Sequence, residues 1–399
     1  MEKFSLTLYL EINKSHYVFF VGESKDQNHF KIIYHLEIPL KGIESNRISN
    51  LDKAFHLIKE NVYIIEQKFN HTFKEIVLIL ENFNLSFINL SGYKKLNGSQ
   101  VLKENITYIL NVLKSYIDKI ESKKTVLHIF NSKFQLDGKK IDNLPVGLFG
   151  DFYSHELSFA LIDTNDHKNL YSIFDKCNLR IRKTLLKSFV KGANLSDNNI
   201  NIDTFFDIKI YDTSSKIFYF ENNSLKFEQD FTFGYNIILR DISKITSLKI
   251  NNVKSILNKL EFNKEIFKDD DFIEELFFKD ETYRKIKKKL IYDIILARIS
   301  EIFTLMISKN INLNYYKKTT KVIFFELNNQ FQIKGLGEMY KNIFSMNGAF
   351  EVKFFDNSSP LSMLNTANKL VHYGWKKEAI PVAQTKKSLI SRFFEAIFG

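Results

Sequence analysis

Residues 126–150 read VLHIFNSKFQLDGKKIDNLPVGLFG, and this stretch guides the interpretation of the whole chain. It begins within residues 125–130, an apolar run of the kind that forms a buried strand. Leu136-Asp-Gly-Lys139 follows and predicts a tight turn, because Asp and Gly tolerate the backbone angles that turns require. A Pro-x-Gly-x-x-Gly pattern then ends the stretch. We therefore expect a strand, a turn and a loop punctuated by glycine.

Strand and helix patterns alternate on both sides of this stretch. Apolar alternation or apolar runs predict strands at residues 4–10, 17–22, 29–39, 75–80, 157–162 and 322–327, and two extended segments within 204–220. Three- and four-residue spacing predicts helices within residues 50–69, 99–120, 167–178 and 272–308. Asn50 stands where it would cap the first helix. The mixture over 399 residues indicates an α/β protein with more than one sheet and more than one domain.

The last residues, 386–399, have an amphipathic pattern. On a helix, one face would carry Leu389, Ile390, Phe393, Phe394, Ile397 and Phe398, and the opposite face would carry Lys386, Lys387 and Arg392. The segment is too short to span a bilayer, which needs about twenty apolar residues. It could lie on a membrane surface or pack on the protein's own core, and its basic residues favour an anionic membrane. The polar residues before it, 376–385, resemble a linker.

Composition limits the classes of function. The net charge of +11 is compatible with an anionic membrane or a nucleic acid, but the basic residues are dispersed and the densest cluster, 284–289, falls in a helical pattern. We therefore expect no nucleic-acid partner. The single cysteine excludes an internal disulfide, and together with the lack of a signal sequence it indicates a cytoplasmic protein. We find no P-loop, no GxSxG motif and no histidine pair at metal-ligand spacing, so no catalytic or metal-binding residue is assigned.

The opening stretch resembles the FtsA family of bacterial cell-division proteins, in which a strand with His leads to Asp-Gly and then to Pro-x-Gly-x-x-Gly. Other segments resemble the family in the same order: 42–43, 169–170, Gly234 with 240–242, 298–303, 335–336 and 366–374. The resemblance implies an α/β protein with the actin-like two-lobed fold, each lobe built on a ribonuclease-H-like core. It also implies an FtsA-type inserted subdomain in the first lobe and a C-terminal amphipathic helix.

The resemblance further implies how the chain is divided. The expected parts are a first-lobe core at 1–81 and 165–190, an inserted subdomain at 82–164, a second-lobe core at 191–255 and 320–375, a second inserted subdomain at 256–319, a linker at 376–385 and a membrane-targeting helix at 386–399.

Relatives of this fold bind ATP with magnesium through glycine-rich loops, but those glycines are replaced here. The three loops read Glu11-Ile-Asn-Lys-Ser-His16, Lys209-Ile-Tyr-Asp-Thr-Ser-Ser215 and Leu327-Asn-Asn-Gln330. The degenerate nucleotide-binding positions are Asn13, Lys14, Ser15, Lys209, Ser214, Ser215, Gly234, Asp241, Asn328 and Asn329. A backbone without side chains approaches phosphate most closely, so we expect weak or absent ATP binding and no hydrolysis. Binding of ATP without chemistry stays open, and no cofactor is assigned.

By resemblance, the chain is an adaptor that tethers FtsZ filaments to the cytoplasmic face of the inner membrane and helps to assemble the division ring at the septum. The FtsZ C-terminal tail would bind the second inserted subdomain at Arg284, Lys288, Arg298 and Glu301. The family also implies self-association into filaments and recruitment of downstream division proteins. Two alternatives remain: a PilM-like scaffold for pilus assembly, and an active ATP-dependent enzyme of the actin superfamily.

Overall fold

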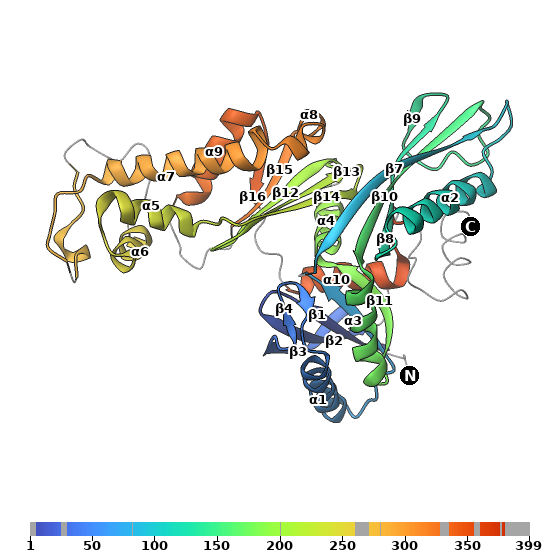
Figure 1. The fold of residues 1–399 in the computed structure, drawn as a ribbon, viewed down its shortest axis with the longest axis horizontal. Helices are drawn as coiled ribbons and strands as arrows, with labels where there is room; N and C mark the ends of the chain where they lie inside the picture. The colour runs from blue at the N-terminus through green and yellow to red at the C-terminus, as the bar shows by residue number, and fades with distance from the viewer. Residues whose placement is uncertain are drawn as a thin grey trace. The chain divides into compact units, whose positions relative to one another are not determined.

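The computed structural model describes residues 5–24, 30–81, 83–199, 201–259, 271–279, 281–327, 335–354, 360–375 and 377–379. The chain divides into two compact units, which are described separately below (Figure 1). The first unit comprises Met1–Asp203, Glu221–Phe227 and Ser358–Gly399, and the second comprises Thr204–Phe220 and Glu228–Asn357.

A five-stranded sheet forms the centre of the first unit, with the strand order β11-β6-β1-β2-β3. Its strands are β1 (Ser5–Ile12), β2 (His16–Ser24), β3 (Phe30–Pro39), β6 (Glu75–Leu80) and β11 (Arg180–Leu186). The first three pair antiparallel, whereas β6 runs parallel to both β1 and β11. The middle of β1 is fully buried, as the apolar run in the sequence predicts.

Helices and two short strands complete this part of the first unit. They are β4 (Ile43–Glu44), β5 (Arg47–Ile48), α1 (Leu51–Phe69), α3 (Thr164–Lys176), α4 (Lys187–Asn198) and α10 (Pro360–Tyr373). The predicted cap of α1 is confirmed, because the Asn50 side chain accepts a hydrogen bond from the backbone N–H of Lys53 at 2.9 Å. The helix predicted at 167–178 starts earlier, since Asp163 provides its N-cap.

A second sheet in the first unit contains the stretch that opens the sequence analysis. Its order is β7-β10-β8-β9, with β7 (Leu85–Lys95), β8 (Lys124–Leu136), β9 (Lys139–Ile141) and β10 (Phe152–Asp163). The predicted turn joins β8 to β9, where Asp137 and Gly138 both have positive φ. Helix α2 (Lys103–Ile120) packs on β7 and buries Ile109, Leu113 and Ile117 against the sheet.

The sheet of the second unit, which also takes in the residues Glu221–Phe227 grouped with the first unit, repeats the strand order of the first sheet. Its order is β14-β13-β12-β15-β16, formed by β12 (Phe205–Ile210), β13 (Ser215–Glu221), β14 (Ser224–Phe231), β15 (Val322–Leu327) and β16 (Glu351–Phe354). As in the first unit, three consecutive strands lie together and two later strands extend the sheet in parallel from the earliest strand. The same topology therefore occurs twice in one chain, as expected for two related α/β cores.

The helices of the second unit correct one prediction. They are α5 (Asn236–Thr246), α6 (Ile250–Lys259), α7 (Lys288–Phe303), α8 (Tyr316–Thr319) and α9 (Leu336–Gly348), with 3₁₀ turns at Glu275–Phe277 and Ile311–Leu313 and a π-helical turn at Thr304–Ser308. The single helix predicted over 272–308 is wrong in its first half. Phe272 pairs with Lys287 as a β-bridge, and α7 begins only after that bridge.

The C-terminal part of the described chain belongs to the first unit. We expected residues 320–375 in the second lobe, but α10 packs against α4 and β3. The Tyr9 hydroxyl donates to Asn368 Oδ1 at 2.8 Å, which fixes α10 to β1. Helix α10, which we expected in the second-lobe core, therefore belongs to the first unit.

Residues beyond α10 add a short extended segment beside β8. We call Trp375 with Lys377–Ala379 the C-terminal clasp. Its backbone forms two hydrogen bonds with β8, from Asn131 N to Lys377 O (2.6 Å) and from Ala379 N to Ile129 O (2.7 Å). The start of the predicted linker at 376–385 is therefore packed where the structure describes it.

A buried ion pair strengthens the clasp. The Glu378 carboxylate lies 2.8 Å from Lys183 Nζ and 2.9 Å from His128 Nδ1, and its side chain is only 2% exposed. Burial disfavours the ionised form of Glu378, but the charge of Lys183 and the hydrogen bonds from Lys183 and His128 have the larger effect. Together they lower the pKa of Glu378 to about 2. The clasp is therefore charged and paired at neutral pH.

Candidate functional site at the strand ends

The carboxyl ends of three parallel strands meet at one edge of the first unit's main sheet. Ile12 of β1 and Leu186 of β11 both pair with Leu80 of β6. In open α/β sheets, ligands bind outside the carboxyl ends of parallel strands. The residues at this edge are therefore the first candidates for a functional site.

Three charged side chains gather at this edge. Lys187, the first residue of α4, places Nζ 2.8 Å from Glu11 Oε1 and 2.8 Å from Glu81 Oε2. The lysine side chain is 24% exposed, and the two glutamates are 16% and 14% exposed. We call these three residues the strand-end cluster. Its ammonium group occupies the position between the two carboxylates.

The first predicted nucleotide loop turns back on itself beside this cluster. Asn13 Oδ1 accepts hydrogen bonds from the backbone N–H groups of Ser15 (2.9 Å) and His16 (2.7 Å). These are N–H groups of the loop that was expected to face phosphate. Because the Asn13 side chain already binds them, these two donors are used within the loop. Lys14 lies in the same turn.

A second lysine and carboxylate pair lies at the matching edge of the second unit. Lys209 on β12 is directly opposite Glu326 on the parallel strand β15, with Nζ 3.8 Å from Oε2. Lys209 is only 6% exposed. Each unit therefore has a lysine paired with a glutamate near the carboxyl ends of its parallel strands.

The second predicted loop is filled by the chain that follows β14. The backbone N–H groups of Tyr235 and Asn236 donate to the carbonyls of Tyr211 (3.0 Å) and Asp212 (2.9 Å). Gly234 lies so near the Tyr211 carbonyl that a Cβ atom would overlap it. Gly234 is therefore required for packing against the turn.

Ser214 and Ser215, from the same predicted loop, also bind within the unit. The Ser214 carbonyl accepts a hydrogen bond from Tyr211 N at 2.9 Å. The Ser215 hydroxyl donates to the Phe233 carbonyl at 2.7 Å.

Three predicted site residues form one ion-pair cluster in the second unit. Arg298 of α7 contacts Asp241 of α5 through Nε, and its Nη1 lies 2.6 Å from Glu301 Oε2. The sequence predicts Asp241 at the nucleotide, and Arg298 and Glu301 at the FtsZ tail. In the structure the Asp241–Arg298 pair joins α5 to α7.

The remaining predicted tail-binding residues differ in exposure. Arg284 is 43% exposed and donates to the Ser247 carbonyl at 2.9 Å. Lys288 is 15% exposed and lies 2.9 Å from Asp271 Oδ1. Arg284 is therefore more available to a partner than Lys288.

Several predicted residues lie outside the described residues. They are Asn328 and Asn329 of the adenosine loop, and Lys386, Lys387, Leu389, Ile390, Arg392, Phe393, Phe394, Ile397 and Phe398 of the amphipathic segment.

The strand-end residues do not fit a magnesium ion. Magnesium is held by oxygen ligands, but here Lys187 Nζ contacts both glutamates, and Lys209 Nζ lies 3.8 Å from Glu326 Oε2 in the second unit. No group of three or more potential metal-ligating side chains occurs within the described ranges. We therefore derive no catalytic step through a metal-bound nucleotide.

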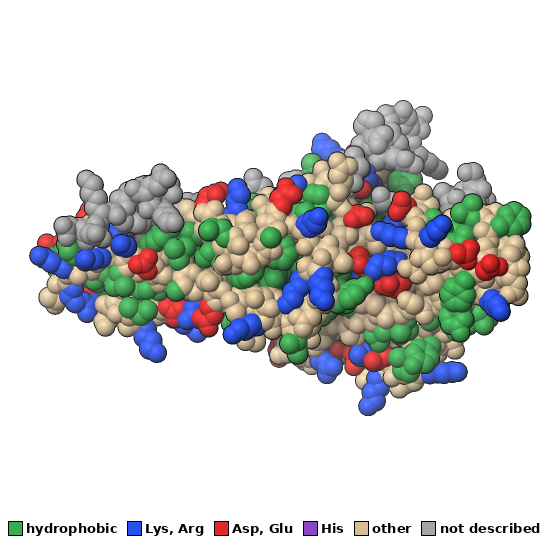
Figure 2. Space-filling model, turned by 90° about the horizontal axis from the view of Figure 1, so that it is seen from above, with side chains coloured by type: hydrophobic (Ala, Val, Ile, Leu, Met, Phe, Trp, Pro, Cys, Tyr) green, Lys and Arg blue, Asp and Glu red, His purple; other side chains and the backbone are tan. Residues whose placement is uncertain are grey.

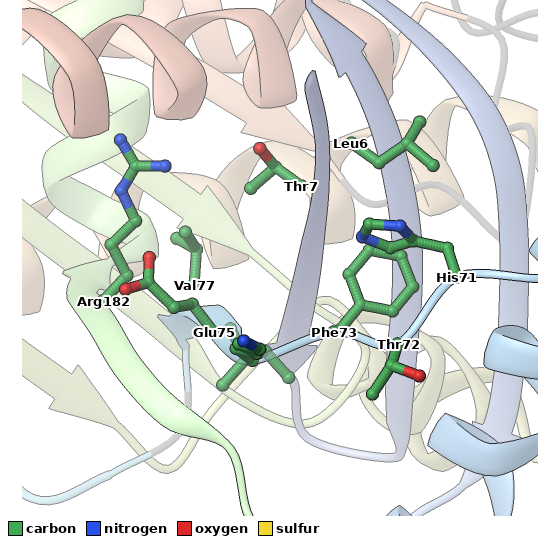
Figure 3. A pocket seen from close by; sticks show the side chains of 10 residues that line it. Leu6, Thr7, His71, Thr72, Phe73, Glu75, Val77 and Arg182 are labelled. Carbon is green, nitrogen blue, oxygen red and sulfur yellow. The ribbon is translucent and has the colours of Figure 1, made fainter. Parts of the chain in front are cut away.

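A pocket of about 300 Å³ in the first unit lies at the other end of the strands (Figure 3). Leu6 and Thr7 from the start of β1, Glu75 and Val77 from β6, and Arg182 line it. These residues belong to the amino-terminal halves of β1, β6 and β11, so the pocket is not at the edge where ligands of such sheets bind.

Charge on the surface is mixed. On the face shown in Figure 2, Lys and Arg side chains are interspersed with Asp and Glu. This agrees with the dispersed charge noted in the sequence.

Among the helices that the structure describes, none has both the length and the apolar character needed to cross a bilayer.

Comparison with known proteins identifies the relatives of the chain. No protein-family model matches it. It is 23% identical over 413 residues to the cell division protein FtsA of Buchnera aphidicola subsp. Acyrthosiphon pisum (strain APS), covering 98% of this chain and 96% of that protein. It is 19% identical over 304 residues to the cell division protein FtsA of Neisseria meningitidis serogroup B (strain ATCC BAA-335 / MC58), covering 75% and 72%.

The fold agrees with that of a solved complex. The structure entitled PilM-PilN type IV pilus biogenesis complex matches with a TM-score of 0.52 at 8% identity, over 92% of this chain and 95% of the matched chain. The chain is FtsA-like and has the actin-like fold. The duplicated strand order of this FtsA-like protein is the feature that such a fold requires.

The sequence predicts Lys209 as a degenerate nucleotide-binding position and places Glu11 in an altered loop, but it gives no role to Glu81 or Lys187. Lys187 directly follows the apolar pair Leu185-Leu186 at the end of β11, which is a weak local signal. Its carboxylate partners, however, are 176 and 106 residues away in the chain.

Proposed function

We propose that this FtsA-like chain is a cell-division adaptor that joins FtsZ filaments to the inner membrane and does not hydrolyse ATP. The names of its relatives support the division role. The strand-end cluster carries the proposal of a non-enzymatic protein, since Lys187 lies between the carboxylates at the ligand-binding edge of the first sheet.

The membrane contact is assigned to residues 386–399, whose apolar face would enter the lipid interface while its basic residues face anionic headgroups. One such helix binds weakly and reversibly. Many copies on one filament would bind together at high effective concentration, which turns weak contacts into stable attachment. The protein would then act at the cytoplasmic face of the inner membrane at the division site.

The FtsZ tail is assigned to the surface around the start of α7. Arg284 is exposed there, and Tyr283 and Leu290 add exposed apolar surface. A basic side chain beside apolar ones suits an acidic peptide with apolar anchors. Self-association into filaments and recruitment of downstream division proteins are further parts of the proposed role.

Co-sedimentation with anionic liposomes tests the membrane part. The full chain and a chain ending at Gln384 are compared, each with and without FtsZ. Pelleting of the full chain alone, with recruitment of FtsZ, is expected. If both chains pellet equally, the terminal segment is not the membrane contact.

Charge reversal tests the tail-binding surface. We expect Arg284→Glu to weaken binding of a fluorescent FtsZ-tail peptide, whereas Lys244→Glu on α5 serves as the control. Equal affinities for both variants and the unchanged protein would exclude the surface at α7.

A pilus-assembly platform is the second candidate, because the matched complex contains PilM. Liposome pelleting without any recruitment of FtsZ would favour this candidate. An active ATPase is the third reading, and release of phosphate from ATP with magnesium above the level of a heat-treated sample would support it.

A further inference from the structure

We propose that Lys187 is a built-in cation that takes the place of a divalent metal ion between Glu11 and Glu81. The inference goes beyond the division role and stands on the strand-end cluster alone. In the folded chain, Lys187 would keep this site closed to divalent cations.

The geometry of the cluster suits this role. Both Nζ to oxygen distances are 2.8 Å, and the carboxylates come from the ends of two adjacent parallel strands. A calcium ion binds carboxylate oxygens at about 2.3–2.6 Å. Shifts of a few tenths of an ångström would therefore let both glutamates bind one calcium ion in the absence of the ammonium group.

The position of Lys187 in the chain holds the ammonium in place. Strand β11 ends at Leu186, a fully buried residue, and α4 starts directly after it. The next residues of α4, Ser188 and Phe189, are buried as well. The lysine backbone is thus fixed between a core strand and a core helix, and the side chain reaches both carboxylates without a flexible loop.

Charge balance gives the physical reason. Two carboxylates that share so small and so poorly exposed a space repel each other unless a cation lies between them. A lysine supplies that cation permanently, whereas a metal ion supplies it only at sufficient concentration. The first sheet would therefore keep its strand ends together without a bound ion.

The test is a gain of metal binding in Lys187→Met, which removes the charge but keeps an unbranched side chain. Calorimetry with calcium chloride on the full chain should show no binding at this site for the unchanged protein. It should show binding for Lys187→Met with a dissociation constant of about 0.1–1 mM, as for weak calcium modules. The double variant Lys187→Met with Glu11→Gln should lose that binding.

Thermal unfolding gives a second measurement. At 10 mM calcium, the ratio of folded to unfolded Lys187→Met should rise about 10- to 100-fold, which follows from that affinity. Lys133→Met is the matched control, because Lys133 pairs with Glu221, which keeps Lys226 as a second partner. Calcium should not stabilise this control.

Each outcome decides the question. If the unchanged protein binds calcium and Glu11→Gln abolishes this binding, Lys187 does not close the site. If Lys187→Met folds only with calcium, the inference is supported. If it folds under neither condition, Lys187→Ala is tested in the same way, and no response of either variant to calcium overturns the inference.

Discussion

Replacing Glu378 with alanine tests whether the buried ion pair holds the C-terminal clasp on β8. The substitution leaves Lys183, which is 6% exposed, with the Leu370 carbonyl at 3.0 Å as its remaining described hydrogen-bond acceptor. Removing one partner of a buried ion pair costs about 3–5 kcal/mol, because the other charge stays buried and uncompensated. We expect the free energy of unfolding of the first unit to fall by that amount.

Urea denaturation followed by tryptophan fluorescence measures this change. Trp375 is the only tryptophan of the chain, lies in the clasp and is buried, so its emission reports on this region. With a slope of about 1–3 kcal/mol per molar urea, the midpoint should fall by about 1 M or more. The urea midpoint of Glu378→Gln should fall less, because the amide oxygen can still accept a hydrogen bond from Lys183.

A surface pair of the same unit provides the control. Glu121 lies 3.0 Å from Lys124 and both are about one-third exposed, so Glu121→Ala should cost less than about 1 kcal/mol. If Glu378→Ala lowers the midpoint no more than Glu121→Ala, the clasp does not depend on its ion pair and the reasoning fails.

Three further predictions concern the same chain. Burial, aided by Lys377 and Arg182 respectively, lowers the pKa of His155 to about 3 and of His372 to about 4. Below about pH 6.5 these histidines take up protons in the unfolded chain but not in the folded chain. The free energy of unfolding should therefore fall as pH drops from 6.5 to 4, by up to about 1.4 kcal/mol per pH unit for each histidine. Urea midpoints at pH 7, 5.5 and 4.5 measure this fall, and a constant midpoint would contradict it. Gly234→Ala should destabilise the second unit by about 1–3 kcal/mol, because the added Cβ would overlap the Tyr211 carbonyl. Gly337→Ala is the control and should change stability little, because its Cβ would make only ordinary van der Waals contact with Phe354. Thermal unfolding of both variants measures the difference. Asn50→Ala should cost about 0.5–2 kcal/mol through loss of the α1 cap, and Asn50→Asp should restore most of it in the same urea titration.

Much of the fold could be predicted because its signals are local. The Asp137-Gly138 turn, the Asn50 cap and the strands at 75–80 and 322–327 each depend on residues within a few positions of one another. The helix predicted over 272–308 failed for the opposite reason. Its apolar spacing continues through residues 272–287, but Phe272 and Lys287 pair with each other as a β-bridge, so this segment folds back on itself and does not form a helix.

The candidate site depended on contacts that no local pattern contains. The sequence patterns predicted an α/β protein with more than one sheet and an amphipathic pattern in residues 386–399, and the family resemblance added the two lobes and the altered loops. The tertiary structure alone decided that Lys187 meets Glu11 and Glu81, and that Glu378 meets Lys183 and His128. Residues 100 or more positions apart in the chain come together only when the strands assemble into sheets. The partner of a charged side chain is therefore set by strand order and register, whereas a turn or a helix cap is set by its neighbours in the chain.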